Sequence, residues 1–461
     1  MDTVNVGKTG VCSVSGSERI PARTLKGFRD YLPEVMMVRE HLVEIARQVY
    51  RRYGFSPIDT PALEYLEILA GKGGEETDKQ LYRFQDHGGR WVGLRFDLTV
   101  PLARFVAQHG PQLPVPFKRY HIGPVWRGEN TQRGRYREFV QCDFDTIGTR
   151  SVASDIETIQ VIDDLMRSIG FERFTIRVNH RGILSGLLER LGLADRQTVV
   201  LRALDKLDKI GPEQVAAEMA QSAAASPEQV RQILALADMT GSNQAILSQV
   251  ESWLTGSSAG PEALARLREV LEGLRAAGVP EERVRVHLSL ARGLDYYTGI
   301  VFETLLHDLP EIGSVCSGGR YDNLAGLYTS QDWPGVGGSL GLDRLLAAME
   351  ALGRLEKVAT PAPVFVAYFD RDRLGEYVRL AACLREAGLG VELYPEPKKL
   401  SQQLKYADRR GFRLAVIAGS EEFAAGVCQL KDLRRQTQQT LPLEPDAHSL
   451  IHAIRQILAE P

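Results

Sequence analysis

The sequence contains no apolar run long enough to cross a bilayer, which excludes a membrane-spanning helix. Its first residues also lack a charged head followed by an apolar core, so we expect no signal peptide. The five cysteines lie far apart and never form a CxxC pair, which argues against a disulfide framework and a structural zinc site. These absences predict a cytoplasmic protein with reduced thiols, no bound metal of its own and no membrane partner.

Neither sign of charge dominates the chain, since 56 lysines and arginines face 59 aspartates and glutamates and leave a net charge of -3. A nucleic-acid partner would therefore have to be bound by local basic patches rather than by a global positive field. No GxGxxG pattern opens a helix, which disfavours a Rossmann nucleotide site. At 461 residues, with 44% hydrophobic and 25% charged content, the chain is typical of a globular protein with about three domains.

The most informative segment covers residues 117–148. Its middle, residues 127–137, is rich in arginine and glycine, and β-forming residues flank it on both sides. This pattern predicts two strands joined by a long polar loop. Arginine forks suit phosphate oxygens and carboxylates, so the loop is a candidate anion site. A solvated charged hairpin is the other interpretation, because charge runs usually lie on exposed faces.

Two further segments combine strand patterns with polar residues. Residues 94–101 predict a strand that runs into a turn and places Asp97 and Thr99 on one strand face, where they could hold an ammonium group. Residues 286–304 alternate like a strand, with Val286, Leu288 and Leu290 apolar, until residues 292–297 interrupt the pattern. An arginine there is equally compatible with a surface position.

Two glycine-rich segments follow. Gly318 and Gly319 predict a close backbone approach to a ligand or an ordinary tight β-turn. Residues 335–350 predict a strand-to-helix junction with a buried leucine stripe. Arg344 lies off that stripe, as an exposed helix arginine would.

Residues 117–148 resemble motif 2 of the class II aminoacyl-tRNA synthetases in the form found in histidyl-tRNA synthetases. The hexapeptide Arg292-Gly-Leu-Asp-Tyr-Tyr297 resembles a segment specific to that family, and residues 335–350 resemble its motif 3. The helix pattern that begins at residues 26–30 and ends near Gly54, followed by a strand over 55–61, resembles motif 1. The resemblance covers about residues 26–461, with the motifs in the expected order.

The resemblance implies a role for each candidate residue. Arg292 and Arg127 would be catalytic and would lie beside the α-phosphate and the histidine carboxylate. The ATP-binding residues would be Arg127, Glu129, Arg135, Phe139 and Arg344, with Phe139 on the adenine and Arg344 on the γ-phosphate. The histidine-binding residues would be Asp97, Thr99, Arg127, Gln141, Asp145, Arg292, Tyr296, Tyr297, Gly318 and Gly319. Asp97 and Asp145 stand where some bacterial members carry glutamate.

The expected fold has an α+β catalytic domain with an antiparallel sheet, a helical insertion, and a C-terminal α/β domain with a mostly parallel sheet. The domain boundaries that we predict are a tail at 1–20, catalytic parts at 21–185 and 283–356, the insertion at 186–282, a linker at 357–363 and an anticodon-binding domain at 364–461. In the C-terminal domain, Lys398, Lys399, Lys405, Arg409, Arg410 and Arg413 could provide a basic face for tRNA.

The expected activity is histidine–tRNA ligation. Histidine and ATP would give histidyl-adenylate and pyrophosphate, and histidine would then pass to the 3′ end of tRNA(His). ATP is expected as a substrate with Mg²⁺ bridging its phosphates, and the chain is expected to form a homodimer through motif 1. The alternatives are a non-catalytic regulatory paralogue of ATP phosphoribosyltransferase and a histidine- or tRNA-binding sensor.

Overall fold

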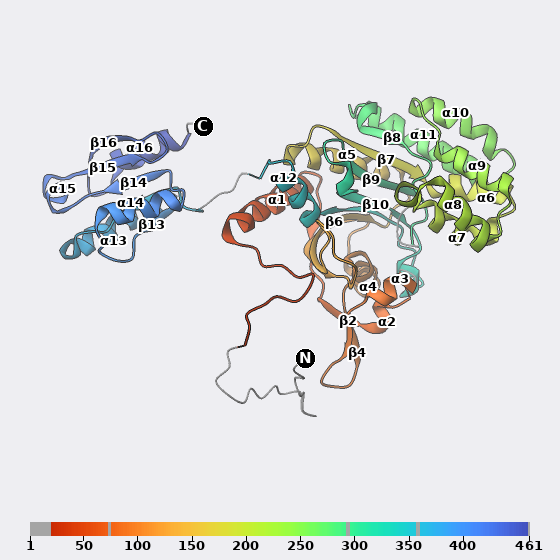
Figure 1. Ribbon diagram of the computed structural model, residues 1–461, viewed down its shortest axis with the longest axis horizontal. Coiled ribbons are helices and arrows are strands. Elements are labelled where there is room, and N and C mark those ends of the chain that lie inside the picture. The colour runs from red at the N-terminus through yellow and green to blue at the C-terminus, as the bar shows by residue number, and fades with distance from the viewer. Residues whose placement is uncertain (1–19, 72–74, 292–295, 356–359, 460–461) are drawn as a thin grey trace.

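The computed structural model describes residues 20–71, 75–291, 296–355 and 360–459. An eight-stranded sheet contains β1 (Ser56–Pro57), β5 (Phe117–Trp126), β6 (Glu138–Ile147), β7 (Phe174–His180), β8 (Val284–Val286), β9 (Ile300–Leu306), β10 (Cys316–Tyr321) and β11 (Gly335–Gly341). The strand order is β1-β5-β6-β11-β10-β9-β7-β8 (Figure 1), and only the pairs β1–β5 and β7–β8 are parallel. The predicted hairpin is confirmed as β5 and β6, which pair from Phe117 with Ile147 to Trp126 with Glu138.

Three helices, α1 (Pro33–Arg52), α5 (Val152–Ile169) and α12 (Leu342–Ala351), cover one face of this sheet near β6 and β11. On that face Tyr50 of α1 stacks on Phe144 with 5.1 Å between ring centroids and donates its hydroxyl to the Cys142 carbonyl at 2.8 Å. Because side chains alternate along a strand, the odd-numbered residues 141–145 of β6 point to the other face, where the candidate site lies.

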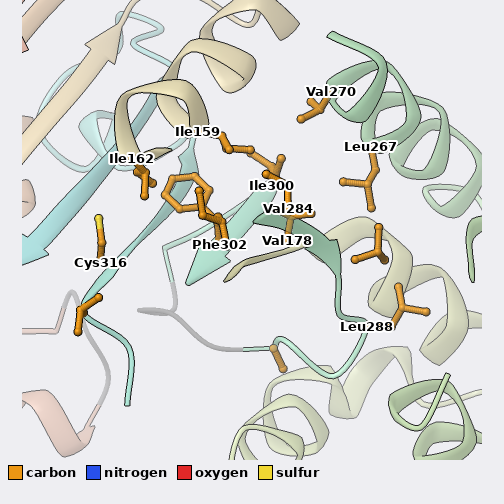
Figure 2. Packing of buried hydrophobic residues seen from close by; sticks show 14 of the residues in the cluster. Ile159, Ile162, Val178, Leu267, Val270, Val284, Leu288, Ile300, Phe302 and Cys316 are labelled. Carbon is orange, nitrogen blue, oxygen red and sulfur yellow. The ribbon is translucent and has the colours of Figure 1, made fainter. Parts of the chain in front are cut away.

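A second part of the core lies between α5, α11 (Gly260–Ala276) and strands β7, β8 and β9, as Figure 2 shows. Eight of its side chains are at most 2% exposed: Ile159, Ile162, Val178, Leu267, Val270, Val284, Ile300 and Phe302. Burial of each such side chain stabilises the fold by about 1.5–3 kcal/mol, so this layer stabilises the packing of the helices on the sheet.

The prediction of several short helices between residues 190 and 280 is confirmed. Besides α11, they are α7 (Gln197–Leu204), α8 (Leu207–Ala223), α9 (Pro227–Ala237) and α10 (Asn243–Leu254), and they follow α6 (Arg181–Arg190). Ser226 and Gln229 form a capping box at the start of α9, where Pro227 occupies the first turn. Within the described parts of the chain, none of the helices has both the length and the apolar character needed to span a membrane.

The predicted start of the first helix is wrong. Residues 26–32 precede α1, which begins at Pro33, a residue suited to the first helical position because its missing N–H needs no partner there. Gly27 has a φ of +87°, which keeps residues 26–28 in a turn. The predicted end near Gly54 is confirmed, with a φ of +78° at that glycine.

The predicted strand over residues 94–101 is also wrong. β4 (Trp91–Leu94) ends there and pairs with β2 (Leu63–Tyr65) and β3 (Arg83–Gln85), and α4 (Thr99–His109) begins at Thr99. Asp97 Oδ1 accepts the backbone N–H groups of Thr99 at 3.1 Å and Val100 at 2.9 Å. These two bonds satisfy amides that the first helical turn leaves unpaired, which explains why a helix starts here. The short helices α2 (Leu66–Leu69) and α3 (Glu75–Gln80) lie between β2 and β3 in the sequence.

The predicted strand through Leu290 is shorter than expected. β8 ends at Val286, and the chain then turns, with the Leu290 N–H bonded to the His287 carbonyl at 3.0 Å. The apolar side chains of Leu288 and Leu290 are nevertheless buried, so their alternation reflects burial and not strand pairing.

The C-terminal residues form a five-stranded sheet of β12 (Val364–Val366), β13 (Val391–Leu393), β14 (Leu414–Ile417), β15 (Val427–Asp432) and β16 (Thr437–Pro442) in the order β13-β12-β14-β15-β16. The predicted alternation of strands and helices is confirmed by α13 (Leu374–Glu386), α14 (Leu400–Arg409) and α16 (His448–Ala459). The strands β13, β12 and β14 are parallel as expected, whereas β15 and β16 are antiparallel. The short helix α15 (Ser420–Ala425) and β16 were not predicted.

Candidate active site

Three segments that are distant in sequence enclose a cavity of about 170 Å³ beside the β5–β6 hairpin. The hairpin loop with the start of β6, the residues around the start of β10, and the β11–α12 junction each contribute to its lining. The lining residues are Arg127, Glu129, Gly134, Arg135, Phe139, Gln141, Ser314, Val315, Ser317, Ser339, Gly341, Asp343 and Arg344. All five predicted ATP-binding residues therefore surround one cavity.

Arg127 lies between two aromatic rings. Its guanidinium carbon is 4.4 Å from the centroid of the Phe96 ring and 5.0 Å from that of Phe139, and its Nε donates to the Phe96 carbonyl at 3.1 Å. Burial lowers the pKa of Arg127, and the charges of Asp97 and Glu129 oppose that effect. An arginine remains cationic in proteins, so the site presents a fixed, oriented positive charge.

Two more arginines approach the cavity. Arg135 Nη1 is 3.4 Å from Glu129 Oε2, and Arg344 Nη1 donates to the Ser314 carbonyl at 2.5 Å. The loop docks on α12 through Gly134, where an added Cβ would lie 3.2 Å from Arg344 Cα. The close approach of the loop thus brings together cations from the hairpin and from α12.

The polar face of β6 carries Gln141, Asp143 and Asp145, which are all at most 9% exposed. Their cross-strand neighbours are Gly123, His121 and Arg119 in β5, and Gly341, Ser339 and Gly337 in β11. The glycines make room for neighbouring side chains on this face, because an added Cβ at Gly337 would lie 2.0 Å from Asp145 Oδ1. This face forms a buried polar floor next to the cavity.

Arg119 is fully buried in this floor and pairs with Asp145, at 2.7 Å between Nη2 and Oδ2. The Tyr321 hydroxyl donates to Asp145 Oδ1. Burial raises the pKa of Asp145 while Arg119 and Tyr321 hold it down. Burial also raises the pKa of Asp143, to about 7, with Arg119 opposing the rise and the Asp145 charge adding to it. One arginine thus faces two carboxyls, so the pair cannot ionise freely.

His121 lies beside this pair. Its Nε2 is 2.9 Å from Asp59 Oδ1, yet burial together with the charges of Arg119 and Arg95 lowers its pKa to about 3. The imidazole is therefore neutral at pH 7 and does not neutralise the carboxyls of β6.

The predicted amino-group residues lie at the start of α4. Asp97 is 4% exposed, and burial raises its pKa while its two backbone N–H partners and Arg127 oppose the rise. The Thr99 side chain opposes part of the rise that burial causes in the pKa of the Tyr296 phenol. The rings of Tyr296 and Tyr297 are 5.0 Å apart between centroids, and burial raises the pKa of both phenols, so both stay protonated.

Gly318 and Gly319 lie in the middle of strand β10, so the expectation of a tight turn is wrong. An added Cβ at Gly318 would lie 2.1 Å from the Gly337 carbonyl oxygen, and one at Gly319 would lie 2.9 Å from the Tyr297 ring. Both distances are too short for a side chain. The glycines are required by the close contact of β10 with β11 and with Tyr297.

Arg292, the main catalytic prediction, lies outside the described residues. Four residues that were not predicted from the sequence share the polar floor with the predicted ones: Arg119, Asp143, Ser339 and Tyr321. The two-residue alternation of β6 could have indicated Asp143. Ser339 lies in β11, which pairs with β6, and Tyr321 lies in β10, which pairs with β11, and both pairings are non-local. Across the described ranges, no group of three or more His, Cys, Asp or Glu side chains could hold a metal ion.

Comparisons with known proteins agree on one family. Residues 27–345 match the family described as histidyl-tRNA synthetase, and residues 364–451 match the anticodon binding domain. A histidine--tRNA ligase of Rhodopirellula baltica is 59% identical over 439 residues, which cover 95% of this chain and 99% of that protein. The crystal structure of histidyl-tRNA synthetase from Nostoc sp. PCC 7120 matches with a TM-score of 0.85 and 34% identity over 95% of this chain and 100% of that chain.

A more distant match bears on the regulatory alternative. A Bacillus halodurans structure described as an ATP phosphoribosyltransferase regulatory subunit/histidyl-tRNA synthetase has a TM-score of 0.72 and 25% identity, and covers 84% of this chain and 97% of that chain. That identity is less than half of the 59% found with the ligase. The comparisons therefore give the regulatory alternative no support.

Proposed function

Because the chain belongs to the histidyl-tRNA synthetase family, we propose that the hairpin cavity holds ATP and that the polar floor of β6 holds histidine. The protein is an ATP-dependent histidine–tRNA ligase, and histidine, ATP and tRNA are its substrates. The main support for the proposal is that one cavity is lined by Arg127, Arg135 and Arg344. Gln141 also lines this cavity.

In the first half-reaction, a histidine carboxylate oxygen attacks the α-phosphorus of ATP, and the bond to the leaving pyrophosphate breaks. No protein nucleophile is needed, so catalysis comes from orientation and from cations placed on developing charge. We assign this role to Arg127, which is held between Phe96 and Phe139, and to Arg292. In the second half-reaction, a terminal ribose hydroxyl of tRNA attacks the acyl carbon and AMP leaves.

The remaining ATP contacts follow from the lining of the cavity. Phe139 offers its flat face to the adenine, and Glu129 accepts a hydrogen bond from the adenine amino group. Arg135 and Arg344 bind the outer phosphates, for which guanidinium forks are well suited. The present Glu129–Arg135 ion pair, at 3.4 Å, would then open when ATP enters.

Histidine is bound by the groups around the floor. Asp97, Thr99 and Gln141 hold its ammonium group, whereas Asp145, Tyr296 and Tyr297 line the imidazole pocket. Gly318 and Gly319 form the wall on the β10 side. The buried acceptor of Gln141 supports this arrangement, because its Oε1 has no hydrogen-bond partner among the described residues.

Further parts of the proposal rest on the family alone. Mg²⁺ supplies charge neutralisation on the ATP phosphates and would arrive with the nucleotide, which fits the lack of an acidic cluster in the described ranges. We also propose a cytoplasmic homodimer through motif 1 and retain the domain boundaries given above, with residues 364–461 binding the anticodon.

The test is histidine-dependent ATP–pyrophosphate exchange by the full-length protein, followed by charging of tRNA(His). We expect both activities in the wild type and loss of most exchange in Arg292→Ala with the fold intact. Near-normal exchange in that variant would contradict the role of Arg292. Exchange without charging would mean that the tRNA site is defective, and the absence of both in folded protein would favour a sensor.

A further inference from the structure

The carboxylate of Asp343 completes the edge of β6. The pairing of β6 with β11 ends at Gln141 opposite Gly341, because the chain then leaves β11 and enters α12 at Leu342. Val140 lies one residue beyond this last pair, so β11 offers no acceptor to its backbone N–H, and a buried N–H needs one. Asp343 Oδ2 accepts this N–H at 2.8 Å. A side chain of α12 therefore takes the place of the strand that has ended.

The other contacts of Asp343 come from the chain around the start of α1. The Tyr31 hydroxyl donates to Asp343 Oδ1, and Arg39 Nε lies 3.4 Å from the same oxygen in an ion pair. The Arg39 guanidinium carbon is 4.7 Å from the centroid of the Tyr31 ring. Burial and the charge of Asp343 raise the pKa of the Tyr31 phenol, so the phenol stays protonated and can donate. Asp343 is only 3% exposed, and protein donors bind both of its oxygens.

The bond between Val140 and Asp343 lies between two groups that we assign to ATP. Phe139 directly precedes Val140, Arg344 directly follows Asp343, and both Phe139 and Arg344 line the hairpin cavity. Phe139 is assigned to the adenine and Arg344 to the outer phosphates, which are opposite ends of the nucleotide. This one hydrogen bond therefore fixes the distance between two separate contacts of ATP.

We propose that Asp343 is a positioning residue for ATP, which sets the spacing between the adenine contact at Phe139 and the phosphate contact at Arg344. The inference rests on the proposed binding of ATP in the hairpin cavity. Two contacts held at the correct spacing bind a ligand that spans them more tightly than two loosely connected ones, because the second contact then forms within the same complex. The Tyr31 hydroxyl holds the carboxylate in the orientation that this spacing needs.

The test compares ATP with its two halves, using the full-length protein. Asp343→Ala should raise the KM for ATP in pyrophosphate exchange about tenfold. The inhibition constants of adenosine and of inorganic tripolyphosphate, measured in tRNA charging with excess Mg²⁺, should stay within about twofold of the wild type. Adenosine reaches only the side of Phe139 and tripolyphosphate only the arginines, so neither depends on the spacing. A loss of either inhibitor as large as the loss of ATP would show that Asp343 belongs to one contact, and would overturn the proposal.

Histidine binding reports any general damage to the site. Gln141 is held by its own contacts, since it pairs with Gly341 and its Nε2 donates to Ser339 Oγ at 2.9 Å. The dissociation constant of histidine, measured by calorimetry, should therefore change less than about twofold in Asp343→Ala. Asp343→Asn keeps an oxygen for the Val140 N–H and should recover most of the affinity for ATP. A tenfold loss of histidine affinity, or an equal KM for ATP in the alanine and asparagine variants, would contradict the positioning role.

Tyr31→Phe tests the network without removing the carboxylate. It should raise the KM for ATP about threefold and have no further effect in Asp343→Ala, because its hydroxyl acts through that carboxylate. Tyr53→Phe is the matched control, since the Tyr53 hydroxyl also donates to an aspartate, Asp164 Oδ2 at 2.6 Å, and neither residue lines the cavity. Additive effects of Tyr31→Phe and Asp343→Ala, or equal effects of the two tyrosine substitutions, would overturn the network. If Asp343→Ala does not fold, the comparison of the two tyrosine variants decides alone.

Arg344→Ala separates this inference from the proposed function. If Arg344→Ala raises the KM for ATP while Asp343→Ala and Tyr31→Phe do not, the positioning role is wrong and the ATP site stands. If Arg344→Ala leaves the KM for ATP unchanged, the proposed ATP site fails, and the positioning role fails with it.

Discussion

Replacement of Asp143 by asparagine should make the protein more stable at neutral and alkaline pH. Asp143 is 2% exposed and has its pKa raised from 3.8 to about 7, mainly by burial. Each tenfold change in proton affinity corresponds to about 1.4 kcal/mol, so ionising this carboxyl in the folded protein costs about 4 kcal/mol relative to the unfolded chain. Asparagine is neutral at every pH and does not carry this cost.

The pH dependence follows from the direction of the shift. The folded protein holds the Asp143 proton more tightly than the unfolded chain. The contribution of this carboxyl to the free energy of unfolding is therefore favourable below about pH 4 and is lost as the pH rises to about 7. The free energies of unfolding of the two proteins should therefore be similar near pH 4. They should diverge up to pH 7, with Asp143→Asn more stable by up to about 4 kcal/mol above it.

The assay is urea unfolding of both proteins without ligand between pH 4.5 and 8.5. Asp332→Asn is the matched control, because Arg150 lowers the pKa of this exposed aspartate. At pH values above the ordinary pKa of an aspartate, Asp332→Asn should slightly lower the free energy of unfolding. This change is opposite in sign to the one expected for Asp143→Asn. An Asp143→Asn protein that is no more stable than the wild type at pH 8 would refute the argument that this carboxyl is strained by burial.

Three further substitutions test the geometry. Gly318→Ala should lower the free energy of unfolding by about 1–3 kcal/mol through overpacking, as measured by urea unfolding, whereas Gly326→Ala, whose Cβ would meet nothing within 4 Å, should have little effect. Tyr321→Phe removes the hydroxyl that donates to Asp145 and should raise the histidine dissociation constant about tenfold. An unchanged dissociation constant would contradict the proposed imidazole pocket. Arg344→Ala should raise the KM for ATP about tenfold or more and leave the histidine dissociation constant unchanged. A variant in which only histidine binding changes would contradict the proposed contact of Arg344 with ATP.

Local patterns in the sequence predicted the β5–β6 hairpin, the β11–α12 junction and the helices between residues 190 and 280. Hairpins and capped helices are specified by residues close in sequence, such as Ser226 with Gln229. The start of α4 could not be predicted in this way. Asp97 and Thr99 fit a strand pattern, but the bonds from Asp97 to two backbone amides begin a helix there.

The residues that line the hairpin cavity were easier to find from the sequence than those of the polar floor. Arg127, Glu129 and Phe139 lie within one motif, so a local resemblance identifies them together. Ser339 is separated from Asp143 by almost 200 positions and faces it only because β11 pairs with β6 in this register. Such a contact depends on the whole sheet, and no local pattern contains it.

The most direct test of the account is histidine-dependent ATP–pyrophosphate exchange by Arg127→Ala. Arg127 lines the hairpin cavity, and its guanidinium is the described cation that we propose for the reacting α-phosphate. Arg133→Ala, an exposed arginine of the same loop that does not line the cavity, is the control. We predict that Arg127→Ala loses exchange by at least about a hundredfold with an unchanged urea midpoint while Arg133→Ala stays close to the wild type. Equal exchange in the two variants would contradict the central claim.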